Sequence, residues 1–101
     1  MKEVVFLAAG QSDLLAHYDR MESTGSGRGE VFSEALDRGL TLISQHPFIA
    51  REYRDGIRRF VLRRFHLGVF YVVEGNRIMI CRIPDLRQSP EIIERFVEPF
   101  R

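Results

Sequence analysis

The residues with the most evident chemistry are two pairs of arginines inside an apolar run. Residues 56–73 read GIRRFVLRRFHLGVFYVV, which places Arg58, Arg59, Arg63 and Arg64 among residues typical of a buried sheet. A guanidinium group is always charged and offers a planar fork of donors that fits a carboxylate or a phosphate. Four such groups in one strand-like segment predict a surface that binds an anionic partner, although a solvated charged face explains the same residues.

The positive charge of the chain is concentrated in its central third. The net charge is only +1, but residues 1–50 contain four basic and seven acidic side chains, residues 51–87 contain nine and four, and residues 88–101 contain two and three. All nine basic side chains of the central segment are arginines. Arginine forms bidentate contacts and stacks on aromatic rings, so this bias strengthens the prediction of an anion-binding surface.

The apolar pattern predicts one α+β domain spanning residues 1–101. We expect an N-terminal strand, a two-helix hairpin packed on an antiparallel three- to four-stranded sheet, and a short C-terminal helix. The expected segments are a strand at 3–9, a helix from Ser12 to Met21, a flexible connection at 23–29, a helix at 30–44, strands at 57–65, 67–74 and 77–83, and a helix that begins after Ser89.

Several residues mark the ends of these elements. Pro47 should end the second helix at the residue before it, because a residue before proline is disfavoured in the α region. The Glu-Gly-Asn stretch at 74–76 predicts a tight reversal between two strands. Ser89 followed by Pro90 is typical of a helix start, with proline at the first helical position.

Other features narrow the function. The glycines of STGSGRG at 23–29 have neither the spacing of a dinucleotide-binding loop nor the Gly-Lys-Ser/Thr ending of a P-loop. Cys81 is the only cysteine and lies in an apolar run, which predicts a reduced core residue and favours the cytoplasm. No membrane-spanning or secretory segment is expected, and no residue spacing indicates a metal site or a cofactor.

The order of these motifs resembles the RelE/ParE superfamily of small bacterial toxins. The resemblance covers residues 4–96, and its most specific parts are the His-Pro at 46–47, RFHLGVFY at 64–71 and DLRQSP at 85–90. It implies the α+β fold described above. It also implies a type II toxin–antitoxin module, in which an extended or helical segment of a cognate antitoxin wraps the toxin and neutralises it.

Two activities occur in that superfamily. RelE-like members cleave messenger RNA on the ribosome without a metal, and ParE-like members inhibit DNA gyrase. Arg87 matches the C-terminal arginine of the RelE pattern. However, the central-strand arginine falls on Gly68, the tyrosine of the last segment falls on Ile93, and a histidine found in some relatives falls on or near Asp85. The resemblance therefore favours a ParE-like gyrase inhibitor, which is not an enzyme.

The endoribonuclease remains the alternative, with the ribosome and messenger RNA as partners. Its candidate catalytic residues are Arg64, Arg87 and His66. His66 and Tyr71 are five residues apart in an extended stretch, so they should point to opposite faces and cannot easily share one site. We expect His66 at a strand junction and Tyr71 in the core with its hydroxyl at the rim. A degenerate, non-toxic family member is a further alternative.

The predicted binding residues are arginines of the strands and of the segment after them. Strand alternation over 57–65 would place Arg58 and Arg64 on one face with Phe60 and Leu62, and Arg59 and Arg63 on the other with Ile57, Val61 and Phe65. Such mixed faces suit an acidic, amphipathic antitoxin segment or another protein target, and a hetero-oligomer with the antitoxin is expected. Cationic strands also resist edge-to-edge aggregation, which explains them without a partner. The predicted antitoxin- or target-binding set is Arg58, Arg59, Arg63, Arg64, Arg82 and Arg87.

Overall fold

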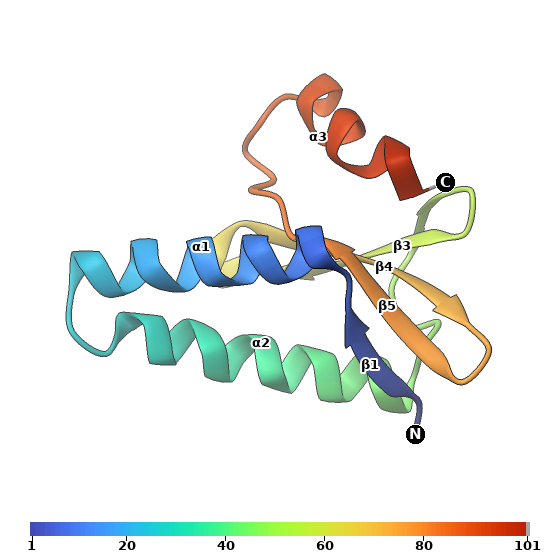
Figure 1. Ribbon diagram of the computed structural model, residues 1–101, viewed down its shortest axis with the longest axis horizontal. Helices are drawn as coiled ribbons and strands as arrows, with labels where there is room; N and C mark the ends of the chain where they lie inside the picture. Colours follow the sequence, from blue (N-terminus) through green and yellow to red (C-terminus); the bar gives the residue numbers. More distant parts are fainter. Residues whose placement is uncertain (101) are drawn as a thin grey trace.

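Two long helices cover one face of a five-stranded sheet, and a short helix covers the other. The computed structural model describes residues 1–100. Figure 1 shows the hairpin of α1 and α2 beside the sheet and α3 on its opposite side. The elements are β1 (Glu3–Phe6), α1 (Ala8–Thr24), α2 (Arg28–Gln45), β2 (Glu52–Arg54), β3 (Ile57–Leu62), the 3-10 turn η1 (Arg63–Phe65), β4 (Leu67–Glu74), β5 (Arg77–Arg82), α3 (Pro90–Val97) and the 3-10 turn η2 (Glu98–Phe100).

The predicted α+β class, helical hairpin and short last helix are confirmed, but the sheet differs in two details. Its order is β1-β5-β4-β3-β2, so five strands are present where three to four were expected. The sheet is mixed, because β1 runs parallel to β5 while the other neighbours are antiparallel. The extra strand, β2, has only three residues and lies in a segment predicted as a loop, since three residues are too few to show an alternating pattern.

The core has two layers, one on each face of the sheet. On the face of the hairpin, Phe32 and Leu36 of α2 pack against Val69 and Tyr71 of β4. On the other face, Ile57 and Phe70 pack against Ile93 and Val97 of α3. Strand β4 is buried on both faces, as its nearly continuous apolar sequence predicts. Tyr71 lies in the core as predicted, and its hydroxyl donates a 2.7 Å hydrogen bond to the backbone oxygen of Pro47.

The predicted boundaries of β1, α1 and β3 differ from those observed: β1 ends at Phe6 rather than at residue 9, β3 ends at Leu62 rather than at residue 65, and the start of α1 is four residues earlier than expected. Ser12 was expected to cap α1, but the helix begins at Ala8 after Leu7, whose side chain makes no capping hydrogen bond. The early start brings Gly10 against the backbone of β5, where an added Cβ would lie 2.6 Å from the Ile80 oxygen. At the other end of the chain, the Ser89 hydroxyl accepts a hydrogen bond from the amide of Ile92 and caps α3 as predicted.

The connection between β3 and β4 departs from the predicted strands. A strand at 57–65 leaves one residue for the reversal into the next strand, which is too short for a hairpin. The chain instead leaves the sheet after Leu62, forms η1 and passes through His66 in the left-handed region, with φ of 57°. The predicted alternation is therefore wrong beyond Leu62. Phe65 packs edge-on against Phe32, with ring centroids 5.6 Å apart, on the hairpin side.

Cys81 is a buried free thiol, as its apolar neighbours predict. Burial raises the pKa of this thiol to about 11, so it remains protonated and unreactive near neutral pH. Within residues 1–100, no helix is both long and apolar enough to cross a membrane.

Candidate partner-binding surface

The six predicted binding arginines divide into two groups according to their partners within the protein. Arg58, Arg82 and Arg87 contact carboxylates, whereas Arg59, Arg63 and Arg64 form no ion pair with any carboxylate in the described part of the chain. All three unpaired residues are exposed. The unpaired arginines are the ones that an external anionic group can reach without breaking an internal ion pair, although the Arg64 guanidinium lies 5.5 Å from the ring centre of Phe65.

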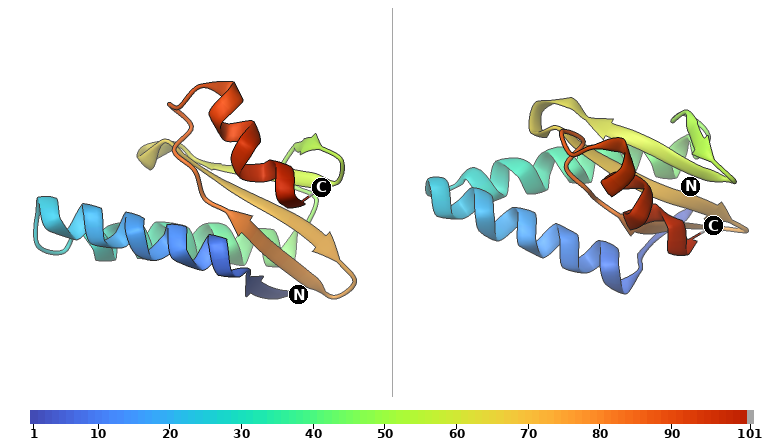
Figure 2. Two further views of the ribbon diagram at one scale, coloured as in Figure 1. Left: turned by 45° about the horizontal axis from the view of Figure 1, so that its top comes forward. Right: turned by 90° about the horizontal axis from the view of Figure 1, so that it is seen from above.

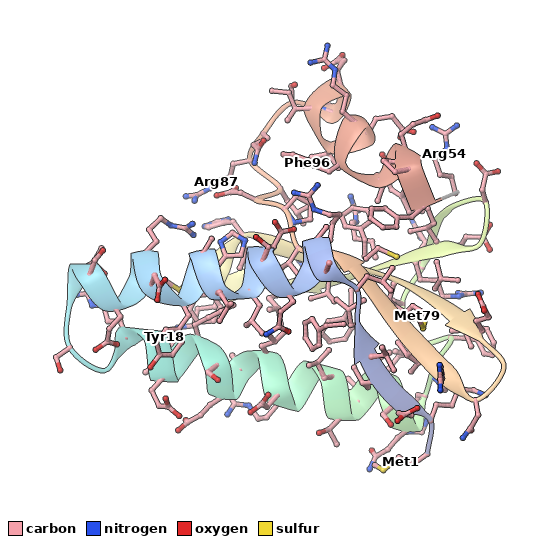
Figure 3. The ribbon with its side chains drawn as sticks, in the orientation of Figure 1. Met1, Tyr18, Arg54, Met79, Arg87 and Phe96 are labelled. Carbon is pink, nitrogen blue, oxygen red and sulfur yellow. The ribbon has the colours of Figure 1, made fainter. Side chains whose placement is uncertain are left out.

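Arg82 holds three elements together. Its Nε and Nη2 donate hydrogen bonds of 2.8 and 3.1 Å to the two carboxylate oxygens of Asp13 on α1. Asp13 Oδ2 also accepts a 2.8 Å hydrogen bond from the amide of Ile83. The Arg82 guanidinium lies 4.4 Å from the ring centre of Phe96 on α3, which Figure 3 labels. This arginine therefore fastens α1 and α3 to the end of β5.

Arg58 is engaged at the start of β3. Its Nη1 donates a 2.8 Å hydrogen bond to the Ala50 oxygen, and its guanidinium lies 4.8 Å from the ring centre of Phe48. Its Nη2 is 4.0 Å from a carboxylate oxygen of Glu52. These contacts tie the loop before β2 to the sheet, because one side chain binds a backbone oxygen, a ring and an acid.

Arg87 is exposed but paired with Asp85 in its own loop. Nε and Nη2 of Arg87 donate hydrogen bonds of 3.0 and 2.7 Å to the two oxygens of Asp85. Figure 3 shows Arg87 on the loop between β5 and α3, above α1. The hydrogen bonds from the Arg87 side chain are the main cause that lowers the pKa of Asp85 to about 2. Asp85 is therefore ionised at neutral pH and neutralises the arginine beside it.

The three unpaired arginines border grooves on both sides of the end of β3. A groove of about 420 Å³ between α2 and β3 is lined by apolar residues together with Arg38, Arg63 and Arg64. Arg64 also borders a neighbouring groove of about 400 Å³, whose lining includes Arg28 and Val31. Neither lining contains a carboxylate. Both grooves thus combine apolar contact area with uncompensated positive charge.

A third groove, of about 570 Å³, is also bordered by the end of β3 and shares Val61 and Arg63 with the first. It is lined by Arg51, Glu52, Tyr53, Arg59, Val61 and Arg63. The hydroxyl of Tyr53 donates a 2.9 Å hydrogen bond to Glu94, which also accepts from Arg54 and so fastens β2 to α3. Burial, followed by this hydrogen bond to Glu94, raises the pKa of Tyr53. The Tyr53 hydroxyl is therefore protonated and uncharged where it lines this groove beside the arginines.

Sequence reasoning missed several residues of these grooves, notably Arg28, Arg38 and Arg51. Arg38 lies on the flank of α2 that faces the end of β3. Helical periodicity separates a buried stripe from a polar one and carries no information about a flank that borders a groove. Arg51 belonged to the arginine-rich central segment, and that charge bias was the one signal that could have identified it.

The three candidate catalytic residues of the alternative function, Arg64, Arg87 and His66, are not brought together in the two grooves described above that Arg64 borders. These two grooves are lined by neither His66 nor Arg87. His66 is exposed at the junction between η1 and β4, where it was expected, and its backbone oxygen accepts a hydrogen bond from the amide of Leu86. Among residues 1–100, no cluster of three or more histidine, cysteine or acidic side chains could hold a metal ion.

Comparisons with known proteins give a structural likeness. No family model matches the sequence, and no curated protein matches it. A solved chain described as "Chromosomal ParDE TA system from P. aeruginosa" has a TM-score of 0.61 and 21% sequence identity, covering 85% of this chain and 97% of that one. The predicted ParE-like fold is confirmed. At this identity, the likeness establishes the arrangement of the elements, while activity and partners have to be argued from the residues of this chain.

Proposed function

We propose that this chain is the ParE-like toxin of a type II toxin–antitoxin module, which inhibits DNA gyrase in the cytoplasm by binding it and is neutralised by a cognate antitoxin. The observation that carries the proposal is the set of unpaired arginines: Arg63 and Arg64 border grooves with apolar residues in their walls, and Arg59 borders a third, more polar groove together with Arg63. Apolar area supplies affinity for a protein partner, and exposed cations supply orientation and speed of association. The fold shared with the ParDE chain supports the same assignment.

The geometry favours protein binding over RNA cleavage. Metal-free cleavage at a ribose needs a base, an acid and cations that meet at one phosphate. Arg87, the residue that matches the RelE pattern, has the Nε–Nη2 edge of its guanidinium engaged by Asp85. An ionised aspartate at that position repels a phosphate. Arg64 and His66 do not line a common groove among those that contain Arg64, so the acid–base arrangement that the nuclease requires has no support here.

Controlled expression tests the toxin assignment. Induction of the wild-type chain in a bacterial host should arrest growth, and co-expression of the adjacent reading frame should restore it. The test variant carries Arg59→Ala and Arg63→Ala; it should fold normally and either lose toxicity or escape neutralisation, and Arg77→Ala is its control. If growth continues although soluble expression of the wild-type chain is confirmed, the chain is a degenerate member of the superfamily.

The target is tested separately with purified components. Wild-type protein added to gyrase should suppress supercoiling or trap cleaved DNA. Mapping of message ends in induced cells should reveal no new cuts. If gyrase is unaffected and message ends appear that Arg87→Ala abolishes, the nuclease is the correct function. Together with the growth assay, these two readouts distinguish a toxin that acts on another target from a chain that has no toxicity.

A further inference from the structure

The end of β3 is an open sheet edge. Strand β2 pairs with β3 only at Ile57 and Arg58, and the Arg59 amide adds one hydrogen bond to the Arg51 oxygen. Beyond this point, residues 60–62 have β4 on one side and no strand on the other within the described chain. Figure 2 shows β3 at the margin of the sheet, with the short β2 beside one of its ends.

Val61 presents its backbone to this open side. Amides of alternate residues in a strand point to opposite sides, and the Arg59 amide points toward β2. The N–H and C=O of Val61 therefore point in the same outward direction, past the end of β2. An open edge of this kind is a template for an additional strand.

Grooves of different chemistry lie on the two sides of this edge. Phe60 and Leu62 project toward α2, where they and Leu42 line the first groove, and the aromatic edge of Phe60 would lie 2.9 Å from a Cβ on Gly39. Arg59 and Val61 project to the other face, where Arg51, Glu52, Tyr53 and Arg63 complete the lining of the third groove, so that three arginines there outnumber one carboxylate. Val61 and Arg63 line both grooves, as expected for residues at the edge itself.

We infer that this edge receives an extended segment of an acidic partner protein as an added strand, collinear with β2. In the bound segment, alternate side chains point to opposite faces. Apolar side chains enter the groove between α2 and β3, and acidic side chains on the other face meet Arg51, Arg59 and Arg63. The partner segment thus alternates apolar and acidic residues. This inference rests on the proposed function, and within it the partner is the antitoxin.

Other occupants fit the surface less well. A second copy of this chain would bring the edge arginines of both copies together, and like charges at an interface oppose association. The phosphates of RNA could contact the arginines. RNA cannot, however, form the backbone hydrogen bonds of an added strand, and it has no apolar side chains to fill the groove lined by Phe60 and Leu42. The combination of an open backbone edge, an apolar wall and arginines is complementary to an acidic polypeptide.

Proline at position 61 tests the backbone contact directly. Val61→Pro removes the outward N–H, yet it leaves the hydrogen bonds of β3 to β4 intact because they come from the neighbouring residues. Val61→Ala is the matched control, since it trims the same side chain and keeps the amide. With the protein encoded by the adjacent reading frame as the probe, Val61→Pro should weaken binding about tenfold or more, and Val61→Ala by no more than about twofold.

Amide hydrogen exchange on the wild-type complex gives a second readout that needs no variant. The Val61 amide should exchange quickly in the free protein and slowly in the complex. A complex that forms while Val61→Pro binds as well as Val61→Ala, or while this amide remains fast, overturns the added strand and leaves the proposed function standing. Absence of both toxicity and complex overturns both. An RNA oligonucleotide that displaces the partner and binds Val61→Pro unchanged would assign the arginines to nucleic acid instead.

Discussion

The guanidinium of Arg87 and the carboxylate of Asp85 form a two-pronged ion pair, with Nε to Oδ1 at 3.0 Å and Nη2 to Oδ2 at 2.7 Å. Asp85 Oδ1 accepts a further hydrogen bond from the Arg87 amide. The Asp85 carboxylate therefore holds both the guanidinium of Arg87 and the backbone of the loop. The arginine that matches the RelE pattern is thus exposed but paired with an aspartate of its own loop.

The pair predicts a pH dependence of stability at acid pH. The pKa of Asp85 is about 2 in the folded protein, below its value of about 3.9 in an unfolded chain. A depressed pKa contributes stability above the unfolded value, and that contribution is lost as the pH falls from about 4 to about 2. Asp85→Asn should flatten this part of the curve of unfolding free energy against pH. The effect is small because Arg87 is 65% exposed and water screens the pair.

Urea unfolding at several pH values between 2 and 5 measures this effect. Arg87→Gln is the matched control, because it leaves the carboxyl in place and returns its pKa toward the ordinary value. If the unfolding free energy changes with pH at the same slope in wild type, Asp85→Asn and Arg87→Gln, the low pKa of Asp85 does not come from this pair.

The contact of Asp13 with Arg82 predicts a much larger loss of stability. Both side chains are mostly buried, at 18% and 24% exposure, and Asp13 also accepts from the Ile83 amide. Asp13→Ala leaves a partly buried guanidinium and one amide without their partner. We expect it to reduce the free energy of unfolding by about 2–3 kcal/mol. Chemical denaturation of Asp13→Ala, Arg82→Met and the double variant gives the coupling between the two residues, and a coupling near zero would contradict the pairing.

The close approach of α1 to β5 predicts an unusual effect of alanine. In a helix interior, replacement of glycine by alanine normally stabilises by up to about 1 kcal/mol. At Gly10 the new Cβ would lie 2.6 Å from the Ile80 oxygen, and a backbone oxygen in a sheet cannot move aside. Gly10→Ala should therefore destabilise the protein by about 1–2 kcal/mol despite its helix propensity. The exposed Ala16→Gly on the same helix is the control, and it should lose about 1 kcal/mol through propensity alone.

The sequence alone was sufficient to predict the elements whose apolar pattern is local and extends over many residues. Strand β4 and helix α2 were predicted within two residues of their bounds, because continuous apolar residues and helical spacing extend over many positions. The place of β1 parallel to β5 could not be read in the same way, since pairing between distant strands depends on packing rather than on local pattern. The turn η1 was missed because an apolar segment does not reveal where a strand leaves the sheet.

The candidate site was predictable in composition but not in geometry. The charge bias of residues 51–87 correctly indicated where the cations lie along the chain. It could not separate Arg82, which binds an aspartate 69 residues away on α1, from Arg59, which has no such partner in the described chain. Which arginines are available to a partner is decided by long-range neighbours that only the folded chain brings together.

The difference between unpaired and paired arginines leads to the most direct prediction about binding. Arg59→Ala with Arg63→Ala removes exposed cations that hold no internal ion pair, so the free energy of unfolding should change by less than about 0.5 kcal/mol. Binding to the protein of the adjacent reading frame should slow in association, because exposed charges act mainly on the encounter rate. The matched control is Arg77→Ala on the far side of the sheet, where Arg77 contacts Glu3 at 3.2 Å.

Stopped-flow association at low and high salt separates the outcomes. Wild type and Arg77→Ala should associate at similar rates that fall with added salt, whereas the double variant should associate more slowly and depend less on salt. If the double variant behaves like wild type, the unpaired arginines are not the partner surface. If Arg77→Ala slows association as much, the rate reflects net charge rather than a localised site, because β4 separates β5, which carries Arg77, from β3.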